Sequence, residues 1–290
     1  MKALLRKALL PVAKRFVAGE TKQSAIEHVE DLNEDGIRGM VDLLGEHVED
    51  ESEADTAVRE YEGLLELFEE HDLEAGLSVK PTHLGLEIGY EYCLDNLKYL
   101  VRRAEGMDRT VWLDMESSDY TQETIDLYRE LASRWDNVGI CIQCYLKRSE
   151  NDIMDLIEDE EVEERIRLVK GAYDEPEEIA YRDAEKVSEN FRSLLELLFE
   201  DAHYVAVGTH DKELVEYAKQ LEEQYDRSRE SFEFQFLMGV RRDLKHEIAD
   251  EGYTVAEYVP YGEEWMDYYY RRVRERTENL KFAVRAFLGS

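Results

Sequence analysis

Cysteine is scarce in this chain of 290 residues, which carries only Cys93, Cys141 and Cys144. Three thiols cannot build a disulfide framework, so a reducing cytoplasm is the simplest compartment. Cys141 and Cys144 have CxxC spacing, but they fall in the apolar run VGICIQCYL, which is typical of a strand. Residues three apart on a strand point to opposite faces, which favours buried thiols over a shared metal. The seven histidines form no HxxxH or HxH pattern, so we expect no metal site.

Positive charge is also in short supply. The chain has 36 Lys and Arg residues against 69 Asp and Glu residues, for a formal net charge of -33. Such a field repels nucleic acid, which excludes a nucleic-acid partner for the bulk surface. The acidic excess is spread over many segments, and a uniform excess self-repels unless salt screens it. The composition therefore favours a halophilic protein, and an ordinary acidic cytosolic protein is the alternative.

Long apolar runs are absent, so the sequence predicts no membrane span. The first 19 residues, MKALLRKALLPVAKRFVAG, are basic and contain no acidic residue. They lack the cleavage site of a signal peptide. A basic amphipathic helix can lie on the inner face of an anionic cell membrane, and docking on the acidic body of the protein is the alternative.

Only four prolines occur, and no Ser/Gly-rich linker divides the chain. We expect N-terminal helices over residues 1–34 and one larger domain over residues 35–290. In that domain, apolar runs alternate with long acidic segments that have helical periodicity, a pattern typical of a parallel sheet. The runs span residues 37–44, 77–85, 110–115, 138–146, 166–173, 203–210, 232–239 and 253–262.

Eight runs at near-even spacing predict a closed (β/α)₈ barrel, in a distorted form preceded by the N-terminal helices. A doubly wound open sheet is the alternative, and no GxGxxG motif follows the first run to support it. Catalytic groups of a barrel come from the carboxyl ends of its strands. Polar residues late in the predicted strands are Lys80, Asp114, Gln143, Lys170, Thr209, His210, Gln235 and Tyr258. Because unpaired polar groups are costly in a buried strand, we expect them to contact one another or a ligand.

Two of these residues, Lys80 and Asp114, end neighbouring predicted strands. They could form a structural ion pair, or they could hold a zwitterion with the lysine toward its carboxylate. In RLVKGAYDEP, the side chains of Arg167 and Lys170 should diverge, one toward the barrel interior and one toward the rim. A cation here could stabilise a reduced flavin, Lys170 could form a Schiff base, or both could be structural ion pairs.

The tetrapeptide GTHD, residues 208–211, lies between a predicted strand and a predicted helix. Thr209 could bind a nucleotide near the helix N-terminus, but capping of the helix by Thr209 or Asp211 is the favoured interpretation. Near the C-terminus, Tyr268, Arg271 and Arg272 share one face of a predicted helix. The arginines could grip a planar carboxylate in a bidentate manner, or they could pair with Glu275 and Glu278.

Seven segments in this order resemble the proline dehydrogenase family: SVKPTHLGL, LDMES, IQCYLKR, RLVKGAYDEP, GTHD, FEFQFLMG and YVPYGEEWMDYYYRR. The resemblance runs from about residue 15 to the end of the chain. It implies a distorted (β/α)₈ barrel that holds FAD. It also implies oxidation of L-proline to Δ1-pyrroline-5-carboxylate, with hydride passing from proline C5 to flavin N5 and electrons passing on to a quinone.

The resemblance also implies roles for individual residues. Asp114 and Arg167 match the family's active-site pair, with the arginine near the flavin N5. Substrate would be held by Lys80, Tyr258, Tyr268, Leu237, Arg271 and Arg272. Flavin-contacting positions match Met115, Gln143, Lys170, Gly171, Ala172, Thr209 and His210. A separate pyrroline-5-carboxylate dehydrogenase is expected to consume the product. A lyase or aldolase that uses Lys170, and a barrel that only binds an amino acid, remain alternatives.

Overall fold

The computed structural model describes residues 13–266 and 268–270. Its strands are β1 (Arg38–Leu43), β2 (Ala75–Val79), β3 (Val111–Leu113), β4 (Val138–Gln143), β5 (Arg165–Val169), β6 (Tyr204–Gly208), β7 (Phe232–Leu237) and β8 (Val255–Tyr261). Its helices are α2 (Lys22–Glu34), α3 (Glu51–Glu70), α4 (Tyr90–Glu105), α5 (Thr121–Ala132), α6 (Ser149–Ile157), α7 (Ala184–Asp201), α8 (Lys212–Gln224) and α9 (Arg242–Asp250). Two short 3-10 helices, η1 (Ser118–Tyr120) and η2 (Arg229–Ser231), precede α5 and β7.

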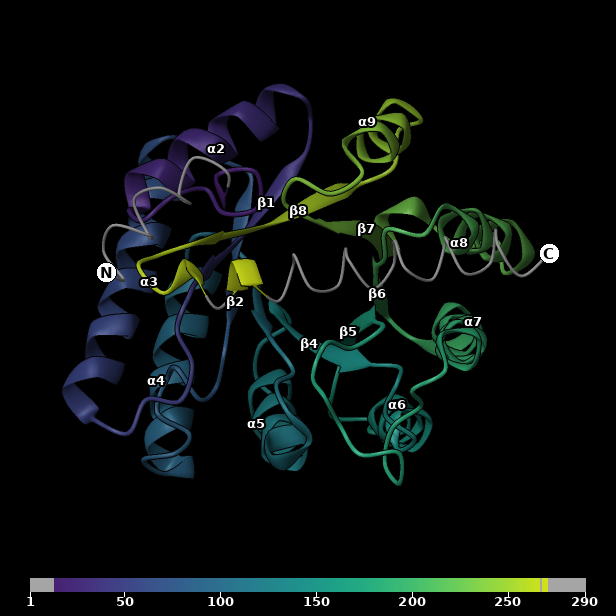
Figure 1. Ribbon diagram of the computed structural model, residues 1–290, viewed down its shortest axis with the longest axis horizontal. Coiled ribbons are helices and arrows are strands. Elements are labelled where there is room, and N and C mark those ends of the chain that lie inside the picture. The colour runs from purple at the N-terminus through teal and green to yellow at the C-terminus, as the bar shows by residue number, and fades with distance from the viewer. Residues whose placement is uncertain (1–12, 267, 271–290) are drawn as a thin grey trace.

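The strands form one closed parallel barrel in the order β1 to β8, and the helices surround it as a ring (Figure 1). Closure is made by β1, which pairs in parallel with β2 on one side and with β8 on the other. Met40 lies opposite Tyr258 in the closing pair. The predicted (β/α)₈ barrel is confirmed, and the open-sheet alternative is wrong because an open sheet has no bond between its first and last strands.

Each predicted run overlaps one strand, but the strands end earlier than the apolar pattern indicated. The run 110–115 contributes only Val111–Leu113, and the run 77–85 stops being a strand at Val79. Pro81 follows two residues later, and proline has no N–H to donate to a ladder. The polar ends of these runs therefore lie in the loops of the carboxyl rim.

The barrel interior on the side away from the carboxyl ends of the strands is filled by side chains. Met40, Trp112, Ala206 and Ala256 form a buried cluster there. Gly139 on β4 makes room for the indole, because a Cβ at this position would lie 2.4 Å from the Trp112 ring. With this layer packed, a ligand can enter only from the opposite, carboxyl end of the strands.

The outer helices bury one face each against the barrel. In α4, buried residues recur at steps of three and four, which is the period of an amphipathic helix packed on a sheet. Several helices begin at a side-chain cap. Asp183 accepts hydrogen bonds from the backbone N–H groups of Glu185 and Lys186 at the start of α7, which satisfies donors that the helix leaves unpaired.

The chain before β1 docks on the barrel. Ile26 and Val29 of α2 belong to the main buried core, and α2 lies beside β1 and β8 (Figure 1). The backbone N–H of Ala18 donates to the carbonyl of Pro260 at 2.9 Å. The division into residues 1–34 and 35–290 stays a prediction. Of the helices in residues 13–266 and 268–270, none has the length and apolar character needed to span a bilayer.

The described residues after β8, 262–266 and 268–270, return to the barrel mouth. Trp265 is fully buried, and its indole N–H donates to Glu20 at 2.8 Å. Tyr268 packs in the same small cluster as Val17 and Leu44. Figure 1 shows this short yellow segment inside the ring of helices, where it can cover part of the carboxyl rim.

Candidate active site at the carboxyl rim

A cavity of about 650 Å³ opens at the carboxyl rim, a size typical of small-molecule sites. It is lined by every polar residue that was predicted to converge there: Lys80, Asp114, Gln143, Lys170, Thr209, His210, Gln235 and Tyr258. Met115, Arg167, Gly171, Ala172, Leu237 and Tyr268 line it too. The predicted convergence at one rim is confirmed. Arg271 and Arg272 lie outside the residues that the structure describes.

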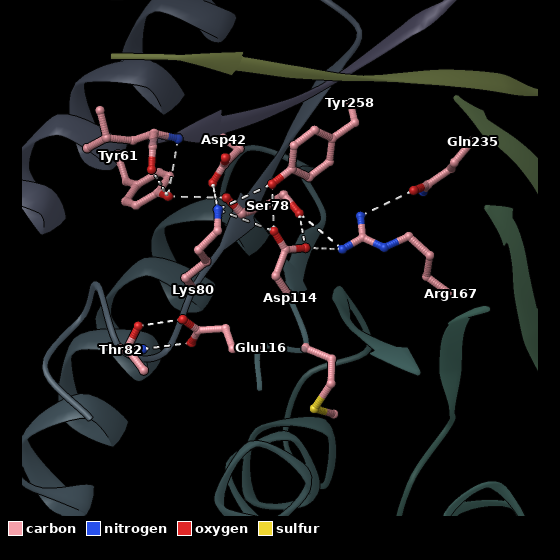
Figure 2. A network of polar contacts seen from close by, with 12 residues as sticks. Asp42, Tyr61, Ser78, Lys80, Thr82, Asp114, Glu116, Arg167, Gln235 and Tyr258 are labelled. Atoms are coloured by element: carbon pink, nitrogen blue, oxygen red, sulfur yellow. Dashed lines mark hydrogen bonds and ion pairs between the residues drawn. The ribbon is translucent and has the colours of Figure 1, made fainter. Parts of the chain in front are cut away.

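A buried ion pair joins Arg167 of β5 to Asp114, which follows β3 (Figure 2). Ser78 of β2 completes the contact: its hydroxyl donates to Asp114 Oδ1 at 2.7 Å and accepts from Arg167 Nη2 at 3.1 Å. Burial favours the neutral acid, but the nearby Arg167 and Lys80 cations outweigh it and hold the pKa of Asp114 below its usual value. Asp114 is therefore an ionised acceptor at the bottom of the cavity.

The side chain of Lys80 is paired more closely with Asp42 than with Asp114. Lys80 Nζ lies 2.7 Å from Asp42 Oδ1 and 3.7 Å from Asp114 Oδ2. The predicted partnership of Lys80 with Asp114 is thus the longer of two contacts, and Asp42 of β1 was not foreseen. Burial alone would lower the pKa of Lys80, but the Asp42 and Asp114 carboxylates raise it well above its usual value. Lys80 is therefore a fixed ammonium group.

The hydroxyl of Tyr258, on β8, connects these ion pairs. It donates to Asp114 Oδ2 at 2.7 Å and accepts from Lys80 Nζ at 3.3 Å (Figure 2). The guanidinium of Arg167 lies 5.9 Å from the centre of its ring, within the range of a cation–π contact. These contacts fix the plane of the phenol, so that Tyr258 presents a flat and rigid wall to the cavity.

Four buried charges therefore meet at the cavity floor: the carboxylates of Asp42 and Asp114 and the cations of Lys80 and Arg167. The set is neutral as a whole, which limits the cost of burying it. An ammonium group has three donors, and Lys80 uses two of them within 3.3 Å, toward Asp42 and Tyr258. Among the described residues the next acceptor, Asp114 Oδ2, lies 3.7 Å from Nζ, beyond hydrogen-bond distance, so the third donor points to the same floor of the cavity.

The other side of the cavity has the features needed to hold a planar, polar ring system. Gln143 donates from Nε2 to the carbonyl of Met115 at 2.9 Å, while its buried Oε1 has no hydrogen-bond partner among the described residues. A buried acceptor without a partner fits a donor on a ligand. Gly171 has φ +107°, and a Cβ there would lie 2.1 Å from the Tyr145 ring. Only glycine lets the backbone follow this path along the cavity wall.

Arg167 and Lys170 diverge as predicted. Arg167 is 4% exposed and points into the barrel, whereas the side chain of Lys170 is 38% exposed at the rim. Lys170 Nζ lies 3.3 Å from Asp211 Oδ2 and 3.2 Å from Ser188 Oγ. Lys170 is therefore held at the rim by one carboxylate and one hydroxyl.

The GTHD segment caps the helix that follows it, as the favoured interpretation expected. Asp211 accepts from the backbone N–H of Glu213 at 3.1 Å at the start of α8. His210 Nε2 accepts from the backbone N–H of Leu237 at 2.9 Å, which places the neutral ring's proton on Nδ1. His210 thereby holds Leu237, another cavity residue, in place.

The cysteines are buried thiols, as expected. Cys93, Cys141 and Cys144 are all buried and free. Cys141 also lines the cavity, which its spacing did not indicate. Burial, opposed by Arg167, raises the pKa of its thiol, so it is kept in the neutral form.

Three further residues, Asp42, Ser78 and Glu116, belong to the site and were not predicted from the sequence. Glu116 accepts from the backbone N–H of Thr82 at 3.0 Å and from the Thr82 hydroxyl, which anchors the loop that carries Lys80 (Figure 2). One signal was available for Asp42: it is a carboxylate inside an apolar run, and such a group requires a partner. Ser78 gave no such signal, because a serine is common in strands of any kind.

The fold and the cavity define a (β/α)₈ barrel enzyme with a charged, preorganised site at the carboxyl rim. The model of the family described as proline dehydrogenase matches residues 25–285. The chain is 36% identical over 276 residues to proline dehydrogenase 1 of Bacillus subtilis subsp. natto, covering 95% of this chain and 90% of that protein. It is 34% identical over 290 residues to proline dehydrogenase of Deinococcus radiodurans, covering 98% and 93%. The chain therefore belongs to the proline dehydrogenase family.

Solved structures with the same fold are larger proteins. Proline utilization A from Bdellovibrio bacteriovorus, inactivated by N-propargylglycine, superposes with a TM-score of 0.86 at 25% identity, over 95% of this chain and 34% of that chain. Proline utilization A from Bradyrhizobium japonicum, as the mutant D779Y, gives a TM-score of 0.74 at 21% identity, over 90% and 30%. This chain thus spans about a third of these proteins, and the second likeness concerns the fold alone.

Proposed function

We propose that this protein oxidises L-proline to Δ1-pyrroline-5-carboxylate with FAD as its cofactor. The observation that carries the proposal is that one cavity collects every described residue at which the family resemblance places substrate or flavin. FAD would supply the acceptor for the hydride that leaves proline C5. The residues that would hold it are Arg167, Met115, Gln143, Lys170, Gly171, Ala172, Thr209 and His210.

The substrate side of the cavity would bind proline, a small ring that carries a carboxylate. Lys80 would give its third donor to that carboxylate, together with Arg271 and Arg272, which lie outside the described residues. Tyr258, Tyr268 and Leu237 would confine the pyrrolidine ring. Orientation of this kind can lower a barrier by roughly 7–11 kcal/mol, because the reacting atoms are already in place.

Proton transfer sets a limit on the roles of the cations. Hydride can leave C5 only when the proline amine is neutral, because its lone pair must form the new C=N bond. Lys80 is held in its charged form by two carboxylates, and Arg167 is paired with Asp114. Neither can accept the amine proton, so we assign both to binding and to charge stabilisation, and we assign proton uptake to solvent.

The partners follow from this reaction. Electrons would pass to a quinone, and a separate pyrroline-5-carboxylate dehydrogenase would consume the product in the cytoplasm. A quinone is a membrane component, so contact of the basic residues 1–19 with an anionic bilayer would bring the cavity to its acceptor. That contact is part of the proposal and is independent of the catalytic assignment.

A product assay separates this function from its two alternatives. With proline and a dye as acceptor, the purified protein should form a cyclic imine and contain extractable FAD. A Schiff-base lyase would instead be colourless and would be trapped covalently by borohydride at Lys170. A barrel that only binds amino acids would bind proline without flavin and without turnover, and either result would refute the proposal.

A further inference from the structure

A carboxylate lies inside the barrel below the cavity. Glu233 of β7 is 4% exposed, and it shares the inward face of β7 with Gln235, two residues later. Its Oε1 accepts from Gln235 Nε2 at 2.5 Å. Among the residues that the structure describes, Glu233 has no arginine or lysine within 4.0 Å. The Tyr204 phenol also forms a hydrogen bond with Glu233, so the described partners of this buried acid are two neutral donors, the Tyr204 hydroxyl and the Gln235 amide.

The amide of Gln235 connects this acid to the site. Gln235 Oε1 accepts from Arg167 Nη1 at 3.2 Å (Figure 2). A guanidinium group only donates, so the amide must turn its oxygen toward Arg167 and its NH₂ group toward Glu233. Glu233 accepts a hydrogen bond from that NH₂ group. This contact favours the same amide orientation as the contact with Arg167 does. The three side chains therefore form one directed chain of hydrogen bonds.

Arg167 is held at both ends of its guanidinium plane. Its Nη2 contacts Asp114 and Ser78, and its Nη1 contacts Gln235. The face of the guanidinium lies 5.2 Å from the centre of the Trp112 ring. The Asp114 arm alone would leave rotation about that contact open. The Gln235 contact removes this freedom, because it fixes the other terminal nitrogen of the same planar group.

We propose that Glu233 is a positioning residue: it orients the Gln235 amide and through it holds the Arg167 guanidinium in register with the flavin. The inference rests on the proposed function, because it assumes that Arg167 stabilises the reduced flavin. Glu233→Gln keeps an acceptor oxygen but removes its charge, and a hydrogen bond to a charged acceptor is about twice as strong as one to a neutral acceptor. Glu233→Gln should therefore lower kcat for proline about tenfold, with little change in KM, because no substrate contact is removed.

The midpoint potential of the bound flavin gives a readout that a structural role would not change. A loosened Arg167 stabilises the reduced flavin less, so Glu233→Gln should shift the potential to lower values. Direct removal of a negative charge would shift it to higher values, so the sign separates the two effects. In the Gln235→Met background, where the amide is absent, Glu233→Gln should no longer lower the potential.

Glu164→Gln is the matched control. Glu164 is also a buried acid, at 6% exposure, and its Oε1 accepts a single bond at 2.8 Å, from the backbone N–H of His203. This variant should change the melting temperature without changing the potential. Arg167→Met separates the failure of the inference from that of the proposed function. If Arg167→Met lowers the potential and Glu233→Gln does not, the positioning role is wrong. If Arg167→Met also leaves it unchanged, the flavin assignment of Arg167 fails.

Discussion

Asp114 and Arg167 are joined across the inside of the barrel, from the end of β3 to the middle of β5, with β4 between their strands. The guanidinium cannot release a proton, and the carboxylate is kept ionised by the two cations near it. The pair therefore presents a permanent dipole at the floor of the cavity, around which the remaining site residues are arranged.

Replacing Asp114 by asparagine should damage both stability and activity. Arg167 would remain as a buried cation without its carboxylate, and breaking a buried pair costs about 3–5 kcal/mol. Urea unfolding and steady-state kinetics with proline would measure the two effects. Asp152→Asn is the control, because Asp152 is a buried acid of α6 that pairs with Arg148, the residue before this helix, away from the cavity. It should lower stability and leave kcat unchanged; equal kinetic loss in both variants would contradict the assignment.

Because Lys80 pairs with Asp42, the losses in unfolding free energy caused by mutating these two residues should not add. Lys80→Met should raise the KM for proline and also destabilise the fold, because the fully buried Asp42 loses its cation. The cost of an uncompensated buried charge is about 3–5 kcal/mol. Adding Asp42→Asn to Lys80→Met should restore much of the stability without restoring the KM. If the two losses in unfolding free energy simply add, the residues are not coupled as described.

The paired arginines at the C-terminus should act on substrate and not on the flavin. Arg271→Met or Arg272→Met should raise the KM for proline, because the loss of an arginine–carboxylate contact in a dry pocket costs about 2–5 kcal/mol. The flavin content of both variants should equal that of the wild type. Unchanged proline kinetics in both variants would show that the carboxylate clamp has been assigned to the wrong residues.

Glu116 should make stability depend on pH. Burial, opposed by the Thr82 bonds, raises its pKa from 4.5 to about 7. Protonated Glu116 thus contributes stability below pH 4.5, and that contribution is lost as the pH rises to about 7. Glu116→Gln should gain stability relative to the wild type over this interval, by up to roughly 3 kcal/mol. Urea midpoints at fixed ionic strength would check this, and a pH-independent difference would refute it.

The acidic surface predicts a requirement for salt. A net charge of -33 is screened over about 3 Å at 1 M salt but over about 10 Å at 0.1 M. If the protein is halophilic, dialysis to low salt should unfold it, and sucrose at the same low ionic strength should rescue it far less than salt does. Full stability at low salt, followed by circular dichroism, would assign the chain to the ordinary acidic proteins.

The barrel itself was predictable, because a β-strand period and a helical period alternate eight times along the chain. The convergence of Lys80, Gln143 and Tyr258 was predictable for a related reason. Parallel strands all end at the same rim, so polar residues late in each run must meet there. Lys80 and Gln143 lie at or just after a strand end, where no knowledge of the register is needed, whereas Tyr258 lies within β8.

The pairing register of neighbouring strands decides which side chains meet, and this register could not be predicted from the sequence. Asp42 lies opposite Ser78, and Lys80 follows two residues later, just after β2 ends at Val79. Lys80 could therefore reach toward β1 or toward β3, and only the closed geometry selects Asp42 over Asp114 as the nearer partner. The same limit hid the Glu233–Gln235–Arg167 chain, because it depends on which residues of β5 and β7 face each other across the interior.

The most direct test of the account is an anaerobic titration of the purified protein with L-proline, followed by visible absorbance. The account predicts a yellow protein whose flavin absorbance is bleached by proline and returns when an electron acceptor is added, while Arg167→Met bleaches far more slowly. A protein that carries flavin and keeps its colour in excess proline would contradict the central claim that this cavity presents proline to the cofactor.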